Sequence, residues 1–227
     1  MITLIAHEIS TPLSAILGYT ELILDSKPVD ESTRESVGIV YSEAERCKTM
    51  LDEILMFSRQ REPRLANTLL RQTIADVLRV MRFDLVKQTV NVSVNGPDYE
   101  IEVLADQDLL KQVLVNLIKN ACHAMKDQKE KKLEIGLDCQ GRLAQVTIRD
   151  HGPGVPLDVI KGITDMVPLP ENAPPEKNGL GLVITSQIVR EHNGHLSAYN
   201  AATGGGVFCV ELPNARPLGE KIFKHAA

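Results

Sequence analysis

The feature that most constrains the fold is a narrow apolar seam in the first quarter of the chain. Small or apolar side chains recur there at alternating spacings of three and four residues, at Val37, Val40, Ala44, Cys47, Leu51 and Ile54. This spacing is typical of a helix in a coiled coil, and Ser32-Thr33-Arg34-Glu35 predicts a capping box at its start. An earlier seam has the spacing of one helix face, at Ile2, Ile5, Ile9, Leu13 and Ile16. The polar stretch "DSKPVDES" between them predicts a loop, so we expect an antiparallel helical hairpin over residues 2–59.

Two helices with such narrow seams cannot bury those seams against each other alone. A homodimer, in which two hairpins form a four-helix bundle, is the natural solution. The alternative is that the hairpin packs on the rest of its own chain. The first helix is also unusual, because His7 and Glu8 stand about one turn before Pro12. A proline inside a helix removes one backbone hydrogen bond, and it predicts a kink there.

A charged, proline-containing stretch, "RQREPRLAN" at residues 59–67, predicts a linker between two domains. After it, helical and strand patterns alternate. We expect helices at about 68–87, 107–126 and 180–192, and strands at about 90–94, 99–105, 132–139, 143–149, 195–200 and 206–212. Strands mixed with helices in this way predict an α+β domain with helices covering one face of a mixed sheet.

Composition and charge exclude several classes of protein. The formal net charge of −5 argues against non-specific binding to nucleic acid, which needs a basic surface. No apolar run is long enough to span a membrane and no signal peptide is visible, so we expect a cytoplasmic protein or a cytoplasmic piece of a larger one. The cysteines form no pair with metal-ligand spacing, and we expect buried, reduced thiols at Cys47, Cys122, Cys139 and Cys209.

Four short segments carry residues that could do chemistry: "HEISTP" at 7–12, "NLIKNA" at 116–121, "DHGPG" at 150–154 and "NGLGL" at 178–182. Each is weak alone. A histidine on a helix is more often structural than catalytic, and two asparagines one turn apart could form an exposed polar stripe. The third segment could be a simple turn after a strand. Glycines before a helix are common, although they let backbone N–H groups approach a phosphate.

Together and in this order, the segments resemble the H, N, G1 and G2 boxes of the sensor histidine kinases of two-component signalling. "HEISTPL" is similar to the H box, "LLKQVLVNLIKNACHAM" to the N box, "RDHGPGVP" to the G1 box and "NGLGLVI" to the G2 box. The resemblance implies a dimerisation and histidine-phosphotransfer hairpin over 1–62, a GHKL-type ATP-binding α/β sandwich over 63–213 and a tail over 214–227. It also implies a catalytic core whose sensor lies upstream, since relatives normally carry more helix before the histidine.

For the first helix, the resemblance implies that His7 is the phosphoacceptor that attacks the γ-phosphate of ATP. Glu8 would hydrogen-bond the other ring nitrogen and act as the general base. Thr11, one turn after His7, would position a water that dephosphorylates the partner regulator. The alternative is that its hydroxyl only bonds a carbonyl one turn back. The implied partners are a second copy of the chain and the receiver domain of a response regulator.

For the second domain, the resemblance implies a site for ATP and Mg²⁺. Asn120 would be the Mg²⁺ ligand, and Asn116 would face the phosphates as an amide that cannot act as a base, which favours transfer over hydrolysis. Asp150 would accept a hydrogen bond from the adenine amino group. The other nucleotide-binding residues would be Gly152, Gly154, Lys177, Gly179, Leu180, Gly181 and Leu182.

One departure from the family pattern leaves the activity open to alternatives. The aromatic F box expected between G1 and G2 is absent from "IKGITDMVPLPENAPPEK", where four prolines disfavour a helical ATP lid: Pro168, Pro170, Pro174 and Pro175. The leading interpretation is an active ATP-dependent protein-histidine kinase. The alternatives are a nucleotide-binding pseudokinase scaffold, which the missing F box favours, and a phosphotransfer protein without ATP binding, which the complete N and G boxes oppose.

Overall fold

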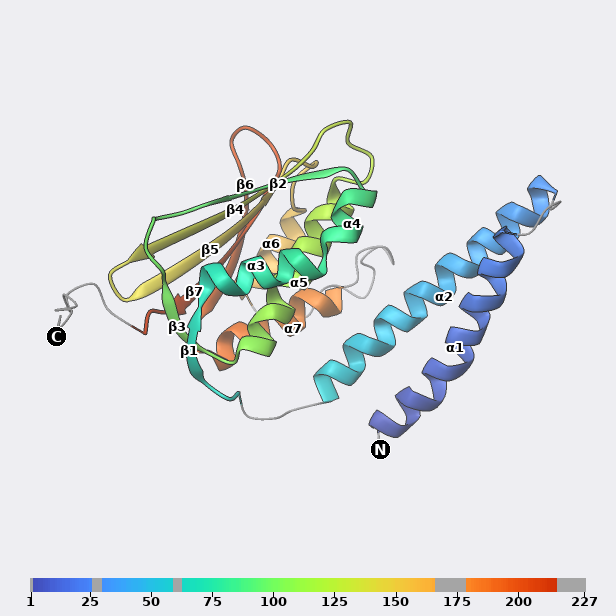
Figure 1. Ribbon diagram of the computed structural model, residues 1–227, viewed down its shortest axis with the longest axis horizontal. Coiled ribbons are helices and arrows are strands. Elements are labelled where there is room, and N and C mark those ends of the chain that lie inside the picture. The colour runs from blue at the N-terminus through green and yellow to red at the C-terminus, as the bar shows by residue number, and fades with distance from the viewer. Residues whose placement is uncertain (1, 26–29, 59–62, 166–178, 216–227) are drawn as a thin grey trace, which may run out of the picture. The chain divides into compact units, whose positions relative to one another are not determined.

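The computed structural model describes residues 2–25, 30–58, 63–165 and 179–215 (Figure 1). The chain divides into two compact units, residues 1–61 and 62–227. The first unit holds the two helical seams, and the second holds all the strands of the described chain. The predicted fold class, a helical hairpin followed by an α/β sandwich, is confirmed.

The first unit is a hairpin of two long helices, α1 (Ile2–Asp25) and α2 (Glu31–Ser58), which pack side by side (Figure 1). Helix α1 is continuous through Pro12, and the predicted kink stays a prediction. Near the tip, the guanidinium of Arg34 on α2 donates a hydrogen bond of 2.9 Å to the carbonyl oxygen of Leu24 on α1. This bond ties the two helices together beside the loop that joins them.

The cap of α2 differs from the predicted capping box. The residue before the helix, Asp30, accepts a 2.6 Å bond from the Thr33 hydroxyl and a 2.9 Å bond from the Thr33 backbone N–H. Those two bonds, the hydroxyl first, hold the pKa of the Asp30 carboxyl below its usual range. A carboxylate at this position also interacts favourably with the helix dipole. Asp30 therefore takes the capping role that the sequence suggested for Ser32.

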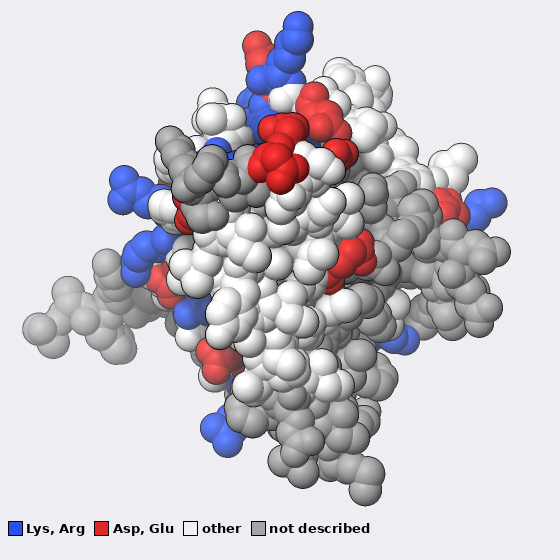
Figure 2. All heavy atoms as spheres, turned by 90° about the vertical axis from the view of Figure 1, so that its right-hand side faces the viewer, with Lys and Arg blue, Asp and Glu red and all other residues white. Residues whose placement is uncertain are grey.

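Much of the apolar surface of the hairpin is exposed in the single chain. In the predicted seam, Ala44 is buried, but Val40 is 49% exposed. The side of the hairpin that faces the viewer in Figure 2 shows a broad band of uncharged side chains. Among the described side chains, the exposed large apolar ones of the hairpin are Ile9, Ile16, Tyr19, Leu22, Ile23, Ile39 and Val40. Two helices alone thus leave the kind of surface that a partner covers.

The prediction that all four cysteines are buried is wrong for Cys47, which is exposed on α2. Its place in the seam suggested burial, but a single hairpin does not cover that part of the seam. Cys122, Cys139 and Cys209 are buried in the second unit, where desolvation raises the pKa of each thiol.

The second unit is built on a five-stranded sheet with the order β2-β4-β5-β7-β6. Its strands are β2 (Val90–Asn95), β4 (Lys131–Gln140), β5 (Leu143–Asp150), β6 (His195–Asn200) and β7 (Gly206–Pro213). The β2–β4 pair is parallel and the other pairs are antiparallel, so the sheet is mixed as predicted. Two short strands, β1 (Ala66–Leu69) and β3 (Glu102–Ala105), form a separate antiparallel pair.

The described part of the second unit has five helices, and Figure 1 shows them gathered on one face of the sheet. They are α3 (Leu70–Val80), α4 (Arg82–Lys87), α5 (Gln107–Ala124), α6 (Leu157–Asp165) and α7 (Gly179–Glu191). Strand β4 shows the reason, because Leu133, Ile135 and Leu137 are buried while the alternating Glu134 and Asp138 are not. Side chains alternate between the two faces of a strand, so the apolar face of the sheet is the one that the helices cover.

Two details of the second unit differ from the predicted elements. The single helix expected at 68–87 is strand β1 followed by α3 and α4, with a break at Met81, whose ψ is 0°. The strand assignment of 66–69 depends on pairing with β3, which is far away in the sequence. Helix α6, which follows Pro156 and buries Val159 and Ile163, was not predicted, because it is too short to show a clear apolar period in the sequence. Within the described ranges, no helix is long and apolar enough to cross a membrane.

Candidate functional site

The buried carboxylate of Asp150 forms one end of the candidate site. Strand β5 alternates, so Val146, Ile148 and Asp150 all point to the helix-covered face, and Asp150 is only 2% exposed. One carboxylate oxygen, Oδ1, accepts hydrogen bonds from the backbone N–H groups of Gly152 at 2.8 Å and of Gly206 at 3.2 Å. Two donors, one in the loop after β5 and one at the start of β7, therefore fix the orientation of this side chain and satisfy one of its buried oxygens.

The loop after Asp150 is held by Asn200, a residue that the sequence pattern did not point to. The Asn200 side chain at the end of β6 accepts a 2.6 Å bond from the Val155 N–H and donates a 2.9 Å bond to the Val155 carbonyl. The preceding Gly154 has φ +96°, which other residues adopt only with strain. A β-carbon on Gly154 would also lie 2.7 Å from Asn200 Oδ1. The glycine and the amide clamp thus define one loop conformation beside Asp150.

A charged cluster lies on the outer side of the same strand end. Glu134 on β4 contacts Lys132 at 2.5 Å, His151 at 3.4 Å and Arg149 at 3.5 Å. The Lys132 ammonium is the largest influence that holds the pKa of Glu134 below its usual range. Arg149 also donates a 2.5 Å bond to the Thr203 hydroxyl in the β6–β7 turn. Arg149 thereby anchors the turn that brings the Gly206 N–H to Asp150.

The other end of the candidate site lies between α5 and α7, which contact each other. The Asn116 side-chain amide on α5 donates bonds of 2.6 Å to the Gly181 carbonyl and 2.7 Å to the Thr185 hydroxyl, both on α7. A β-carbon on Gly181 would lie 2.7 Å from Asn116 Oδ1, so this close approach requires the glycine. Asn116 therefore holds the first turn of α7 against α5, and the buried Thr185 is a second residue that the sequence pattern missed.

The remaining predicted residues of this end are partly described. Asn120 lies one turn after Asn116 on α5 and is half-buried. Helix α7 begins at Gly179, so Gly179, Leu180 and Gly181 form its first turn. Leu182 is partly buried against the core. The backbone N–H groups at a helix start attract anions, so this end of the site suits a phosphate chain. Lys177, the region of the missing F box and its four prolines lie outside the described residues.

The residues proposed for the transfer chemistry lie on α1. His7 and Glu8 are in the first third of this helix, and their side chains lie outside the described part. Thr11 follows one turn after His7 and is exposed. The two sets of predicted residues thus lie in separate units, one on the hairpin and one around the sheet.

Both units match family models. Residues 105–216 match the model described as histidine kinase-, DNA gyrase B- and HSP90-like ATPase, and residues 1–63 match the His Kinase A (phospho-acceptor) domain. Together these models define the catalytic core of a histidine kinase, with an ATP-binding domain of this class.

Curated relatives and solved structures agree with that class. Sporulation kinase A of Bacillus subtilis is 31% identical over 211 residues, which are 92% of this chain and 33% of that protein. The sensory histidine kinase/phosphatase NtrB of Rhodobacter capsulatus is 31% identical over 235 residues, which are 95% of this chain and 62% of that protein. The histidine kinase ThkA in complex with the response regulator protein TrrA has a TM-score of 0.67 at 26% identity, over 92% of this chain and 59% of that chain.

This chain belongs to the histidine kinase family. It spans between a third and two thirds of the length of these two curated relatives. The resemblance read from the four boxes is therefore confirmed.

Loss of the two bonds between Asn200 and Val155 should selectively weaken nucleotide binding. Asn200→Ala removes both bonds to Val155 and frees the loop beside Asp150. Since each such bond contributes about 1 kcal/mol, about 2 kcal/mol is lost, and we expect the Kd for ATP to rise by about tenfold to thirtyfold. Titration with a fluorescent ATP analogue measures the change. Asn214→Ala is the matched control, because that amide contacts Cys139 and Gly141, away from the G1 loop. Equal affinities of the two variants would contradict the role of the clamp.

Proposed function

We propose that this chain is an ATP-dependent protein-histidine kinase that phosphorylates His7 and passes the phosphoryl group to an aspartate of a response regulator. The observation that carries the proposal is the joint presence of a phosphoacceptor-type hairpin and a site with Asp150 at one end and the start of α7 at the other. A nitrogen of the His7 ring would attack the γ-phosphorus of ATP. The bond between that phosphorus and the oxygen that bridges the β- and γ-phosphates would break, and ADP would leave. Glu8 would take the proton from the other ring nitrogen.

The residues around the sheet would bind and orient ATP for this step. The adenine amino group would donate to Asp150, and the first turn of α7, with Gly179 and Gly181, would face the phosphates. Asn116 holds α7 in place and cannot act as a base toward water. This division of roles favours transfer to a histidine over hydrolysis.

A Mg²⁺ ion fits the same end of the site, with Asn120 as its protein ligand. In the described residues, no cluster of three or more His, Cys, Asp or Glu side chains could hold a metal by itself. An ion that keeps waters and phosphate oxygens as its other ligands needs only one or two protein oxygens, as Mg²⁺ does in phosphoryl-transfer sites. When bound, Mg²⁺ would neutralise charge on the phosphates.

The proposed assembly is a homodimer through the hairpin. The hairpin exposes apolar side chains on α1 and α2, and a second hairpin would remove them from water. The proposed downstream partner is the receiver domain of a response regulator, by analogy with the ThkA complex with TrrA.

One experiment tests the proposal most directly. Purified protein is incubated with γ-labelled ATP and Mg²⁺, and the label is examined for stability in acid and alkali. A phosphohistidine is labile in acid and stable in alkali, so this pattern supports the kinase. Nucleotide binding without any label would instead support the pseudokinase scaffold.

Thr11 gives a separate prediction about the reverse reaction. A threonine hydroxyl can donate and accept, so Thr11 could hold a water in line with the phosphorus of the regulator's aspartyl phosphate. Thr11→Ala should slow dephosphorylation of the regulator by about tenfold, or about 1.4 kcal/mol of transition-state stabilisation. Labelling of His7 should stay near normal. If dephosphorylation of the regulator and labelling of His7 fall equally, Thr11 shapes the helix and does not position a water.

A further inference from the structure

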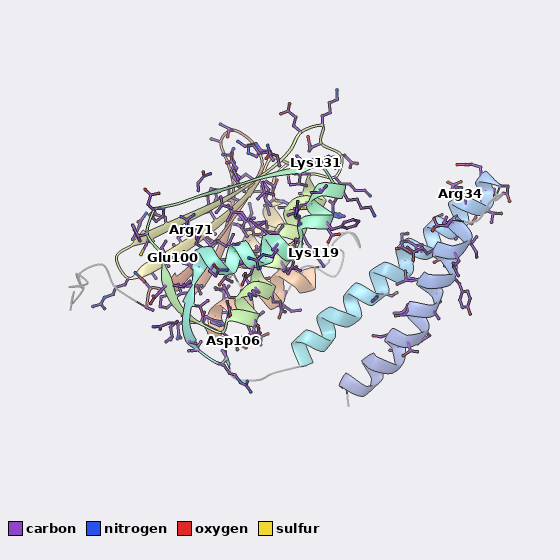
Figure 3. All side chains as sticks on the ribbon, viewed as in Figure 1. Arg34, Arg71, Glu100, Asp106, Lys119 and Lys131 are labelled. Carbon is purple, nitrogen blue, oxygen red and sulfur yellow. The ribbon has the colours of Figure 1, made fainter. Side chains whose placement is uncertain are left out.

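The carboxylate of Asp106 holds two segments of the second unit at once. Asp106 lies between β3 and α5 and is 3% exposed (labelled in Figure 3). Its Oδ1 caps α5 by accepting from the backbone N–H groups of Asp108 at 3.1 Å and Leu109 at 3.3 Å. Its Oδ2 accepts a 2.9 Å bond from the backbone N–H of Arg64, which is 42 residues earlier in the chain. The cap of α5 uses only Oδ1, so the bond from Oδ2 to Arg64 is not part of the cap.

Among the described residues that follow the hairpin, Arg64 is fixed to the second unit by its backbone bond to Asp106. Residue 64 lies three residues after the boundary between the units. The Leu65 N–H donates a 3.1 Å bond to the Pro63 carbonyl, so Arg64 is the centre of a three-residue turn. From the next residues onward β1 runs along β3, with Ala66 opposite Ala105. The bond from Arg64 to Asp106 is therefore an early fixed point of the incoming chain.

A buried histidine attaches the third segment. His192, just after α7, is 3% exposed. Its Nδ1 lies 2.7 Å from the Ile188 carbonyl oxygen, and its Nε2 accepts a 2.9 Å bond from the Asp106 N–H. A carbonyl can only accept and an N–H can only donate, so the ring is neutral with its proton on Nδ1. His192 thus joins the end of α7 to the start of α5.

We propose that Asp106, assisted by His192, is a positioning residue for phosphoryl transfer. It fixes the entry point of the chain from the hairpin relative to the two helices that hold Asn116, Asn120 and the G2 glycines. This inference rests on the proposed kinase function. The rate of transfer depends on how often His7 and the γ-phosphate meet in line, and the fixed point of the connecting chain sets that frequency. In the proposed function, nucleotide affinity depends on Asp150 and the first turn of α7, which the bond between Arg64 and Asp106 does not touch.

A backbone substitution removes the bond without changing Asp106. Arg64→Pro deletes the N–H donor, and the centre of such a turn is a place that suits a proline. Arg64→Ala keeps the N–H and is the matched control. At saturating ATP, we expect Arg64→Pro to autophosphorylate about fivefold to tenfold more slowly than Arg64→Ala, with KM for ATP unchanged. Equal rates would overturn the proposal, and so would a parallel loss of nucleotide affinity, which would indicate a purely structural role.

A second pair of variants protects the test against misfolding. Asp106→Asn keeps one oxygen for the cap of α5 but replaces the other with an amide that cannot accept from Arg64. Asp108→Asn removes the same charge from the first turn of α5, where the side chain is exposed, and is its control. Hydrogen exchange of the Arg64 amide should speed up in Asp106→Asn and stay unchanged in Asp108→Asn, and an unchanged Arg64 amide in both would overturn the anchor. A wild-type protein that takes up no label from γ-labelled ATP would refute the proposed kinase function. The hydrogen-exchange measurement tests the bond between Arg64 and Asp106 independently of that function.

Discussion

Replacement of His7 by alanine should abolish acid-labile labelling of the protein by γ-labelled ATP and leave ATP binding intact. The reason is that His7 lies on α1 of the first unit, whereas Asp150, Asn116 and α7 lie in the second. In the proposed mechanism the transfer step loses its nucleophile, whereas the proposed nucleotide site in the second unit keeps all its residues. The measurement is incorporated label per chain, with the Kd for a fluorescent ATP analogue measured in parallel.

The chain supplies a matched control for this substitution. His195 is an exposed histidine on β6, so His195→Ala removes an imidazole from the second unit, away from α1. It should label as the wild type does. If His7→Ala keeps its label, the phosphoacceptor is a different residue. If His7→Ala loses ATP binding as well, the substitution has disturbed more than the transfer step.

Replacement of Asn120 by alanine should remove the Mg²⁺-dependent part of ATP affinity. Loss of a metal ligand or its support typically weakens metal binding by about tenfold to a hundredfold, and the ATP complex should follow the metal. The Kd for ATP is measured with Mg²⁺ and with a chelator in its place. We expect the variant to bind equally in both conditions, whereas the wild type binds more tightly with Mg²⁺.

Asn116→Ala is the matched control for this experiment, since it removes the same amide one turn earlier on the same helix. The structure shows that Asn116 holds Gly181 and Thr185 of α7, so its loss should loosen the phosphate end of the site. Some Mg²⁺ dependence should therefore remain. Equal, Mg²⁺-independent losses in both variants would show that Asn120 is not the ligand.

The sequence predicted the elements whose side chains repeat with a clear period. Strands β4, β5 and β7 and helices α5 and α7 lie within one or two residues of the predicted ranges. The inward position of Asp150 follows from the same alternation, because Val146 and Ile148 precede it on the buried face. Such elements can be predicted from the sequence alone, because burial of one face places apolar residues at the period of the helix or strand.

The parts that the sequence did not predict depend on contacts between distant segments. Asn200 contacts Val155 across 45 residues, and His192 contacts Asp106 across 86. No spacing rule relates such residues, because the sheet and its turns bring them together only after folding. Strand β1 was missed for the same reason, since its strand character comes from pairing with β3.

The place of β7 in the sheet has a consequence for the order in which the chain matures during synthesis. Strand β7 is the last strand of the described chain, yet it lies inside the sheet, between β5 and β6. Until it emerges from the ribosome, β6 has no neighbour in the sheet and Asp150 lacks the N–H of Gly206. Within one chain, the hairpin is formed by contacts between consecutive helices, which form quickly, whereas pairing of distant strands is slow. A nascent chain therefore completes the two helices of the hairpin well before the site around Asp150, and the proposed dimerisation can precede the proposed use of ATP.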